Sequence, residues 1–316
     1  MSTKTVHPKE QLTFGEKWHR NWINGNTQSN LMLVPAFIFL CVCSIYPFLW
    51  IFRYVLCNYN GFTSTFTGMA NINRMLSDTT FWNSVGTTFE YALYKLIFII
   101  PLALLMAVLL NMKMRGASVF RAVYFMPTII ATSISGMVFT FIFATQNGVL
   151  NAILRGIGLQ TGPRVNWLGN QSYVMTAVTI LAIWGGFGNY MLYFINGING
   201  ISEDVYESSK IDGAGAVRTF FSITLPMLSP VMKVILMLAI TGAFKDYEAI
   251  MVLTQGGPGN RSMVMFLYIY NIIFATSSGS QAQIGYGALL SVVAAVIVGC
   301  VTIIYNIVSR KLDDVM

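Results

Sequence analysis

The sequence predicts an all-α membrane protein with six transmembrane helices. Of its 316 residues, 55% are hydrophobic and only 10% are charged, and the mean hydropathy is +0.63. Apolar content this high has to be solvated by lipid. Apolar runs of about 20 residues, long enough for a helix to cross the bilayer, recur along the chain. A β-barrel would instead need alternating segments of about ten residues, and these runs are longer and evenly apolar.

The six expected spans lie near residues 31–57, 91–111, 123–146, 174–197, 231–254 and 284–308. They divide the chain into a polar N-terminal tail at 1–30, a transmembrane domain at 31–308 and a short C-terminal tail at 309–316. Trp18 and Trp22 in the first tail suit a helix lying in the membrane interface, and a disordered tail is an equally good interpretation. Both tails are expected to be cytoplasmic.

The orientation follows from the distribution of Lys and Arg, which are enriched in cytoplasmic segments. With both ends inside, the inner segments hold about twice as many basic residues as the outer ones. The basic residues assigned to the outer side are Arg53, Arg74, Lys95, Arg155, Arg164 and Arg261. The net charge of +7 therefore indicates topology, and it does not indicate nucleic-acid binding, because the basic residues are scattered over short loops.

A polar loop at about 203–226 interrupts the apolar pattern between the fourth and fifth spans. Residues 207–210 and 214–221 can each form a short helix, and Asp212 and Gly213 supply a turn between them, since glycine tolerates positive φ. Small side chains at Ser208, Ser209 and Ala214 let such a wedge lie close to a partner protein. The alternative is an ordinary amphipathic loop between two helices.

No enzymatic motif is present. The chain lacks a Gly-Lys dipeptide and so has no P-loop, and its two histidines, both in the N-terminal tail, predict neither a metal site nor a catalytic triad. The glycine-rich stretch Gly256, Gly257, Pro258 has no lysine and is interpreted as a tight turn on the outer side. We therefore expect no catalytic residue, no metal and no cofactor bound by this chain.

A polar pathway is predicted within the last three spans. Lys245, Asp246 and Glu248 should face the protein interior, because an ionisable group in lipid costs roughly 2.5–3.5 kcal/mol; a buried structural ion pair is the alternative. Aromatic rings, amides and hydroxyls along such a pathway are groups that can contact a polar solute. The candidate pathway residues are Trp184, Asn189, Tyr190, Tyr193, Phe244, Tyr247, Glu248 and Tyr286. For any one of them, helix packing is the simpler interpretation.

Two motifs carry a resemblance to a known family. Glu207 followed by two small residues, Gly213 six positions after that Glu, and Ile223-Thr-Leu-Pro226 resemble the signature cytoplasmic loop of ABC importer permeases. Thr254-Gln-Gly-Gly-Pro258 after the fifth span resembles a turn of the maltose and glycerol-phosphate type of sugar permease. Such importers contain two permease subunits, and this turn is more typical of the first of them. The resemblance covers about residues 31–308. Ser208-Ser209 replaces the usual Ala-Ala, and the large outer insertion of some maltose permeases is absent.

The resemblance implies a permease subunit of an ATP-driven carbohydrate importer in a bacterial inner membrane. Such a subunit pairs with a second, homologous permease, and two copies of a cytoplasmic ATPase use ATP and Mg²⁺. An extracellular or periplasmic sugar-binding protein delivers the substrate. Glu207, Ser208, Ser209, Asp212, Gly213 and Ala214 would then contact the ATPase. Two other classes remain open: a secondary transporter or channel driven by an ion gradient, and a scaffold or sensor subunit that transports nothing.

Overall fold

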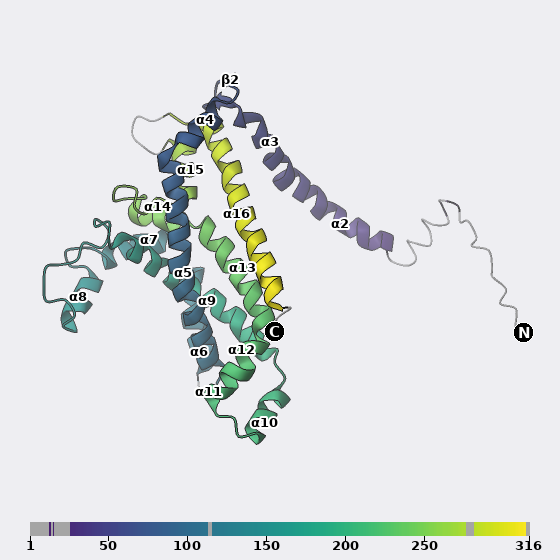
Figure 1. Cartoon of the computed structure of the whole chain (residues 1–316), viewed down its shortest axis with the longest axis vertical. Helices are drawn as coiled ribbons and strands as arrows, with labels where there is room; N and C mark the ends of the chain where they lie inside the picture. Colours follow the sequence, from purple (N-terminus) through teal and green to yellow (C-terminus); the bar gives the residue numbers. More distant parts are fainter. Residues whose placement is uncertain (1–12, 14, 16–25, 113–115, 276–280, 314–316) are drawn as a thin grey trace, which may run out of the picture.

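The computed structural model describes Thr13, Gly15 and residues 26–112, 116–275 and 281–313. Within these residues, four helices are long and apolar enough to cross a membrane, or up to six if each of two bent helix pairs counts as one span. The helices of the main body run side by side (Figure 1). A mostly helical fold is therefore confirmed, with one short strand pair that was not expected, and the number of spans depends on how the bent pairs are counted.

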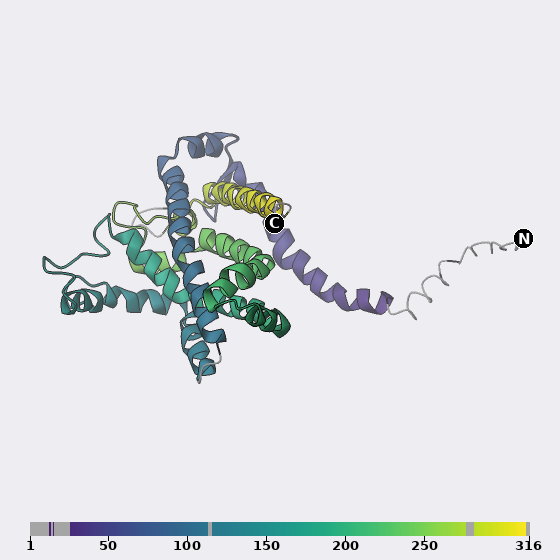
Figure 2. The same ribbon diagram turned by 60° about the horizontal axis from the view of Figure 1, so that its bottom comes forward.

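The first apolar segment runs through α2 (Asn26–Leu40), a π-helical turn η1 (Cys41–Ile45) and α3 (Tyr46–Val55). It leads away from the helix bundle in both views (Figures 1 and 2). None of its most apolar window is buried within the chain. Its apolar side chains therefore face lipid or another subunit.

A short antiparallel hairpin caps one end of the bundle. Strand β1 (Cys57–Tyr59) pairs with β2 (Ser64–Phe66), with Cys57 opposite Phe66. Helices α4 (Ala70–Ser77) and α5 (Thr79–Asn111) follow, and α5 begins at Asp78, whose side chain accepts a hydrogen bond from the Phe81 amide. This carboxylate satisfies an amide that a helix start leaves without a partner.

The middle of the chain contains the sharper bend. Helices α6 (Ala117–Ile129) and α7 (Thr132–Ile142) meet at 97°. Pro127 lies in the last turn of α6, and it lacks the amide hydrogen that a continuing helix would need. The outer helix α8 (Val149–Gly156) leads to α9 (Val174–Asn199), which packs along α5 and α6.

After α9, the chain makes a helical hairpin and returns to the bundle. The segments are α10 (Glu203–Ile211), α11 (Ala216–Thr219), the π-helical η2 (Phe220–Thr224), α12 (Leu225–Met227) and α13 (Ser229–Lys245). The bend between α12 and α13 is 69°. The last helices are α14 (Glu248–Thr254), α15 (Met265–Phe274) and α16 (Ile284–Asp313).

The apolar core joins these helices in layers. One cluster packs α5 against α9 and α13 around Ile99, Met191 and Ile235. A second joins α7, α9 and α14 around Phe139 and Leu181, and a third joins α5, α15 and α16. Residues on α5 belong to all three, so α5 is the central helix of the fold.

Several expected boundaries were wrong. The second span begins at Thr79 and not near 91, which places Lys95 inside a long helix and not on the outer side. The third and fifth spans are each broken, at 130–131 and 246–247. Helix α16 continues to Asp313, into the segment expected to be a tail. Most of the tail at 1–30 lies outside the described residues.

Candidate functional site

The break between α13 and α14 places charged residues and free backbone groups in the middle of the bundle. Asp246 is extended, with ψ 119°, and Tyr247 has φ −144°, so neither continues the helix. Non-helical backbone at membrane depth is tolerated only where it is buried in protein or lines a cavity. Glu248 opens α14, where a carboxylate is favoured by the positive end of the helix dipole.

Asp246 is held by two side chains from α5. Its Oδ2 lies 2.5 Å from the Lys95 Nζ and accepts a hydrogen bond of 2.8 Å from the Tyr91 hydroxyl. The Lys95 side chain is 8% exposed and that of Asp246 is 37% exposed. The structural ion pair considered from the sequence therefore exists for Asp246, but its partner is Lys95 and not Lys245.

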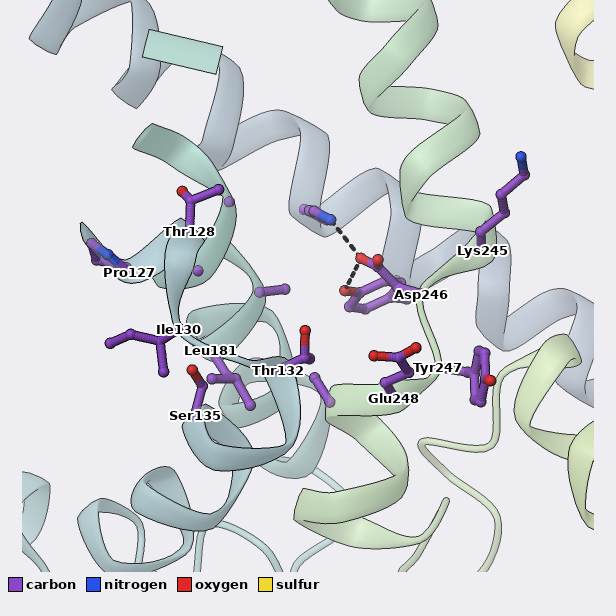
Figure 3. A pocket seen from close by; sticks show the side chains of 16 residues that line it. Pro127, Thr128, Ile130, Thr132, Ser135, Leu181, Lys245, Asp246, Tyr247 and Glu248 are labelled. Atoms are coloured by element: carbon purple, nitrogen blue, oxygen red, sulfur yellow. Dashed lines mark hydrogen bonds and ion pairs between the residues drawn. The ribbon is translucent and has the colours of Figure 1, made fainter. Parts of the chain in front are cut away.

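A cavity of about 340 Å³ lies beside this break (Figure 3). The α6–α7 bend forms the opposite wall, where Pro127, Thr128, Thr132 and Ser135 line the cavity. The Thr128 hydroxyl is buried without a hydrogen-bond partner among the described residues. Two interrupted helices thus face each other across one partly polar space.

Glycines bring the cavity walls close together. A Cβ atom added at Gly136 of α7 would lie 3.0 Å from Val252 of α14. A Cβ added at Gly188 of α9 would clash with the backbone carbonyl of Tyr124 in α6. Gly185 and Gly186 of α9 line the cavity itself. Gly188 therefore permits the close packing of α9 against α6.

The predicted pathway residues are separated by the structure. Only Tyr247 and Glu248 line the cavity. Trp184 packs on Phe139, with ring centroids 5.2 Å apart, and Phe244 packs on Phe89. Tyr190 is buried in the core, Asn189 is half-buried and Tyr193 is exposed. Tyr286 lies elsewhere, in contact with Arg74 and Asp78.

The sequence analysis missed Tyr91, Lys95 and the hydroxyls of the α6–α7 bend. Lys95 is a lone charge in an apolar run, and this signal could have placed it inside the bundle. Its pairing with Asp246 joins residues far apart in the chain, and no local pattern predicts it. Pro127 was the available signal for the bend.

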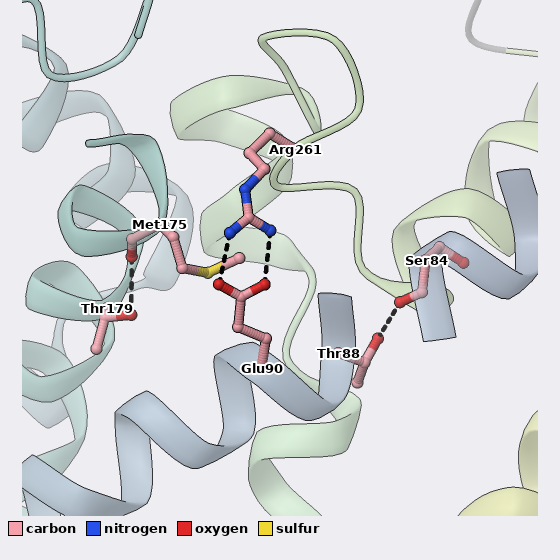
Figure 4. Close-up of polar contacts among 6 residues, drawn as sticks. All are labelled: Ser84, Thr88, Glu90, Met175, Thr179 and Arg261. Carbon is pink, nitrogen blue, oxygen red and sulfur yellow. Dashed lines mark hydrogen bonds and ion pairs between the residues drawn. The ribbon is translucent and has the colours of Figure 1, made fainter. Parts of the chain in front are cut away.

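The predicted tight turn is confirmed at Gly256 and Gly257. The Gly257 amide donates to the Thr254 carbonyl at 2.9 Å, and Gly256 has φ +84°, which favours glycine. Arg261 then forms two hydrogen bonds of 2.6 Å each to the Glu90 carboxylate of α5 (Figure 4). This pairing raises the pKa of Arg261. The turn is thereby tied to the helix that carries Tyr91 and Lys95.

Asp78 lies at the centre of a second group of polar contacts, at the end of the bundle that carries the β1–β2 hairpin. Its Oδ2 accepts 2.7 Å hydrogen bonds from the hydroxyls of Tyr268 and Tyr286, and Arg74 lies over the Tyr286 ring at 3.9 Å. Burial tends to raise the pKa of Asp78, but the hydrogen bonds from Tyr286, the Phe81 amide and Tyr268, with the charge of Arg74, lower it overall. Helices α4, α5, α15 and α16 meet at this carboxylate.

The 203–226 loop folds as a helical hairpin that projects from the bundle (Figure 1). Gly213 has φ +73° between α10 and α11, as the turn required. Glu207, Ser208 and Asp212 are exposed, whereas Ser209 is buried and its hydroxyl donates to the Tyr206 carbonyl at 2.8 Å. Pro226 and Pro230 each lie in the first turn of a helix, where the missing amide hydrogen of proline is tolerated.

Three apolar side chains of this hairpin, not singled out from the sequence, are exposed. Ile211 is 87% exposed, Val217 is 73% exposed and Phe221 is 62% exposed. Exposed apolar residues that lie on a polar loop are typical of a protein-binding surface. For Ile211 the signal was present in the sequence, as an apolar residue between the charged Lys210 and Asp212.

A bundle of long apolar helices, with two of them interrupted at a shared polar cavity, defines the class of solute permeases. Residues 99–314 match the family described as binding-protein-dependent transport system inner membrane component. The chain belongs to this family, which confirms the prediction of an ABC importer permease.

Individual relatives agree with this assignment. The chain is 30% identical to the arabinooligosaccharides transport system permease protein AraP of Bacillus subtilis (strain 168), over 99% of this chain and 97% of that protein. It is 32% identical to the trehalose/maltose transport system permease protein MalF of Thermococcus litoralis, over 79% of this chain and 81% of that one. Its fold is similar to a chain of a bacterial ABC transporter that imports the acidic polysaccharide alginate, with a TM-score of 0.78, 20% identity and coverage of 94% and 98%.

Proposed function

We propose that this chain forms one half of the translocation pathway of an ATP-driven oligosaccharide importer. The observation that carries the proposal is the cavity at which the α6–α7 bend faces the α13–α14 break. Its hydroxyls, at Tyr91, Thr128, Thr132 and Ser135, are groups that exchange hydrogen bonds with sugar hydroxyls. Relatives named for arabinooligosaccharides and for trehalose and maltose support a carbohydrate substrate.

The proposal includes a topology. The α6–α7 pair counts as one span and α13 with α14 as another, which gives six in the domain at 31–308. Both ends of the chain lie in the cytoplasm of a bacterial cell, with the protein in its inner membrane. The hairpin at 203–226 is then cytoplasmic, and the Gly256–Pro258 turn and the β1–β2 hairpin are external. The basic residues favour this orientation.

The remaining subunits follow from the same proposal. A second, homologous permease supplies the other half of the pathway, and two copies of a cytoplasmic ATPase bind ATP and Mg²⁺. An external sugar-binding protein delivers the substrate; a related solved structure is an alginate importer in complex with a pentasaccharide-bound periplasmic protein. Exposed Glu207, Ser208 and Asp212, with Gly213 and Ala214 at the turn, contact the ATPase, and Ser209 supports them from inside the hairpin.

The test is a substitution that breaks the turn of the cytoplasmic hairpin. Gly213→Pro is incompatible with φ +73° and removes the amide that donates to the Lys210 carbonyl. In proteoliposomes that contain the complete importer, we expect ATP hydrolysis that no longer drives oligosaccharide uptake. The control is Gly215→Ala in the same hairpin, where φ is −71° and an added Cβ has open space.

Two outcomes would overturn the proposal. One is unchanged ATP-dependent uptake by Gly213→Pro. The other is oligosaccharide uptake by the isolated chain under an ion gradient without an ATPase. That result would show that the protein is a secondary transporter.

A further inference from the structure

The cavity carries an uncompensated carboxylate. Asp246 and Lys95 neutralise each other across the cavity edge. Glu248 is exposed to the cavity, and among the described residues it has neither a salt bridge nor a hydrogen bond. In Figure 3 its carboxylate points across the space toward Thr132 and Ser135 of α7. Those partners are neutral hydroxyls, so they do not cancel its charge.

Lys245 is the other charged residue of the lining that has no salt bridge among the described residues. Its side chain extends away from the middle of the cavity, on the side of α13 opposite to Glu248 (Figure 3). The two charges therefore do not act at the same point. A ligand between α7 and α14 meets the carboxylate of Glu248 more closely than the ammonium group of Lys245.

We propose that Glu248 makes this half of the pathway select against anionic sugars, so that the substrate is a neutral or amino-substituted oligosaccharide. This inference rests on the proposed function. The carboxylate accepts hydrogen bonds from hydroxyl or ammonium groups, whereas it repels the carboxylate of a uronic acid or the sulfonate of a sulfosugar.

The effect of the Glu248 charge inside the cavity can be measured without any sugar, from the reaction rate of a thiol placed in the cavity. Cys41, Cys43, Cys57 and Cys300 are replaced by serine, and Thr132→Cys places a thiol across the cavity from Glu248. We measure how fast this thiol reacts with a cationic and with an anionic methanethiosulfonate reagent, each relative to a free thiol. The ratio of the cationic rate to the anionic rate should fall roughly tenfold when Glu248→Gln is added.

Lys245→Gln is the matched control, since it removes one charge from the same break. It should change the ratio less than twofold. The proposal would be overturned if Glu248→Gln left the ratio of the cationic to the anionic rate unchanged. It would also be overturned if Lys245→Gln raised this ratio by as large a factor as Glu248→Gln lowers it. If Thr132→Cys does not fold, Ser135→Cys on the same wall replaces it as the reporter.

The selectivity is then tested on the assembled importer. An oligosaccharide that it transports is compared with the analogue in which one primary hydroxymethyl group is oxidised to a carboxylate and every ring stays closed, in equilibrium binding without the external binding protein. The neutral sugar should bind at least tenfold more tightly, and Glu248→Gln should reduce this preference to about threefold or less. Equal binding of the two sugars by the unmodified importer would overturn the inference. Failure to transport any oligosaccharide would instead contradict the proposed function, and the thiol measurement would still report the charge.

Discussion

At the scale of single residues, the pairing of Lys95 with Asp246 predicts a loss of stability when Lys95 is replaced. It is an almost fully buried cation whose charge is balanced by Asp246. Lys95→Met leaves that carboxylate without its partner, while the Tyr91 hydroxyl still donates to it. Removing one member of a buried pair typically costs 3–5 kcal/mol, and because Asp246 is partly exposed we expect about 1–3 kcal/mol.

The measurement is thermal unfolding of the purified chain in detergent as a double-mutant cycle. Lys95→Met with Asp246→Asn should recover much of the loss, because no unpaired charge remains. Additive losses in the double variant would show that the two residues do not stabilise each other.

Asp78 gives a pH dependence with a defined sign. Its pKa in the folded protein lies below the ordinary value of 3.8. The stabilisation is therefore complete above pH 3.8 and is lost as the pH falls through the lower folded value. The difference in melting temperature between the native chain and Asp78→Asn should be constant from pH 7 to 5 and shrink below pH 4. A difference that stays constant down to pH 3 would contradict the assignment.

At the scale of helices, Gly188 sets the distance between α9 and α6. Gly188→Ala introduces a methyl group against the Tyr124 carbonyl and should destabilise by about 1–3 kcal/mol. Gly185→Ala on the same helix meets open space and should be neutral or slightly stabilising, because alanine favours helices by about 1 kcal/mol over glycine. Melting temperatures of the two variants check this, and equal shifts would contradict it.

The sequence was sufficient for most of the helices and insufficient for their interruptions. Hydropathy locates α9 and α16 to within a few residues, because their apolar runs are continuous. The break at Asp246 depends on a carboxylate that binds Lys95 and Tyr91 of a distant helix. Periodicity within one segment carries no information on such a contact. Aromatic residues such as Phe244 were equally ambiguous, since packing and sugar binding favour the same side chains.

At the scale of the whole molecule, the proposed function predicts that the hairpin at 203–226 determines assembly with the ATPase. Ile211→Asp places a charge on the most exposed apolar residue of that surface and should reduce the ATPase recovered with the tagged chain roughly tenfold. The control is Leu159→Asp, which changes a 75% exposed residue in the segment after α8 and should have no effect. Mass spectrometry of the purified complex measures both. If the ATPase is recovered in full with Ile211→Asp, this surface of the hairpin is not part of the interface with the ATPase.

Helix α5 spans 33 residues, which corresponds to about 50 Å, more than the hydrocarbon thickness of a bilayer. Asp78 directly precedes this helix, and Glu90 and Lys95 lie between its start and its midpoint residue. Near its end the Leu110 carbonyl accepts a hydrogen bond from Arg121 of α6. Pro101 separates these two groups and cannot donate the backbone bond of a regular helix. Through Glu90 and Lys95, one stretch of a single helix is joined both to the loop that follows the Gly256–Pro258 turn and to the cavity wall, so the positions of the turn and of the wall are coupled.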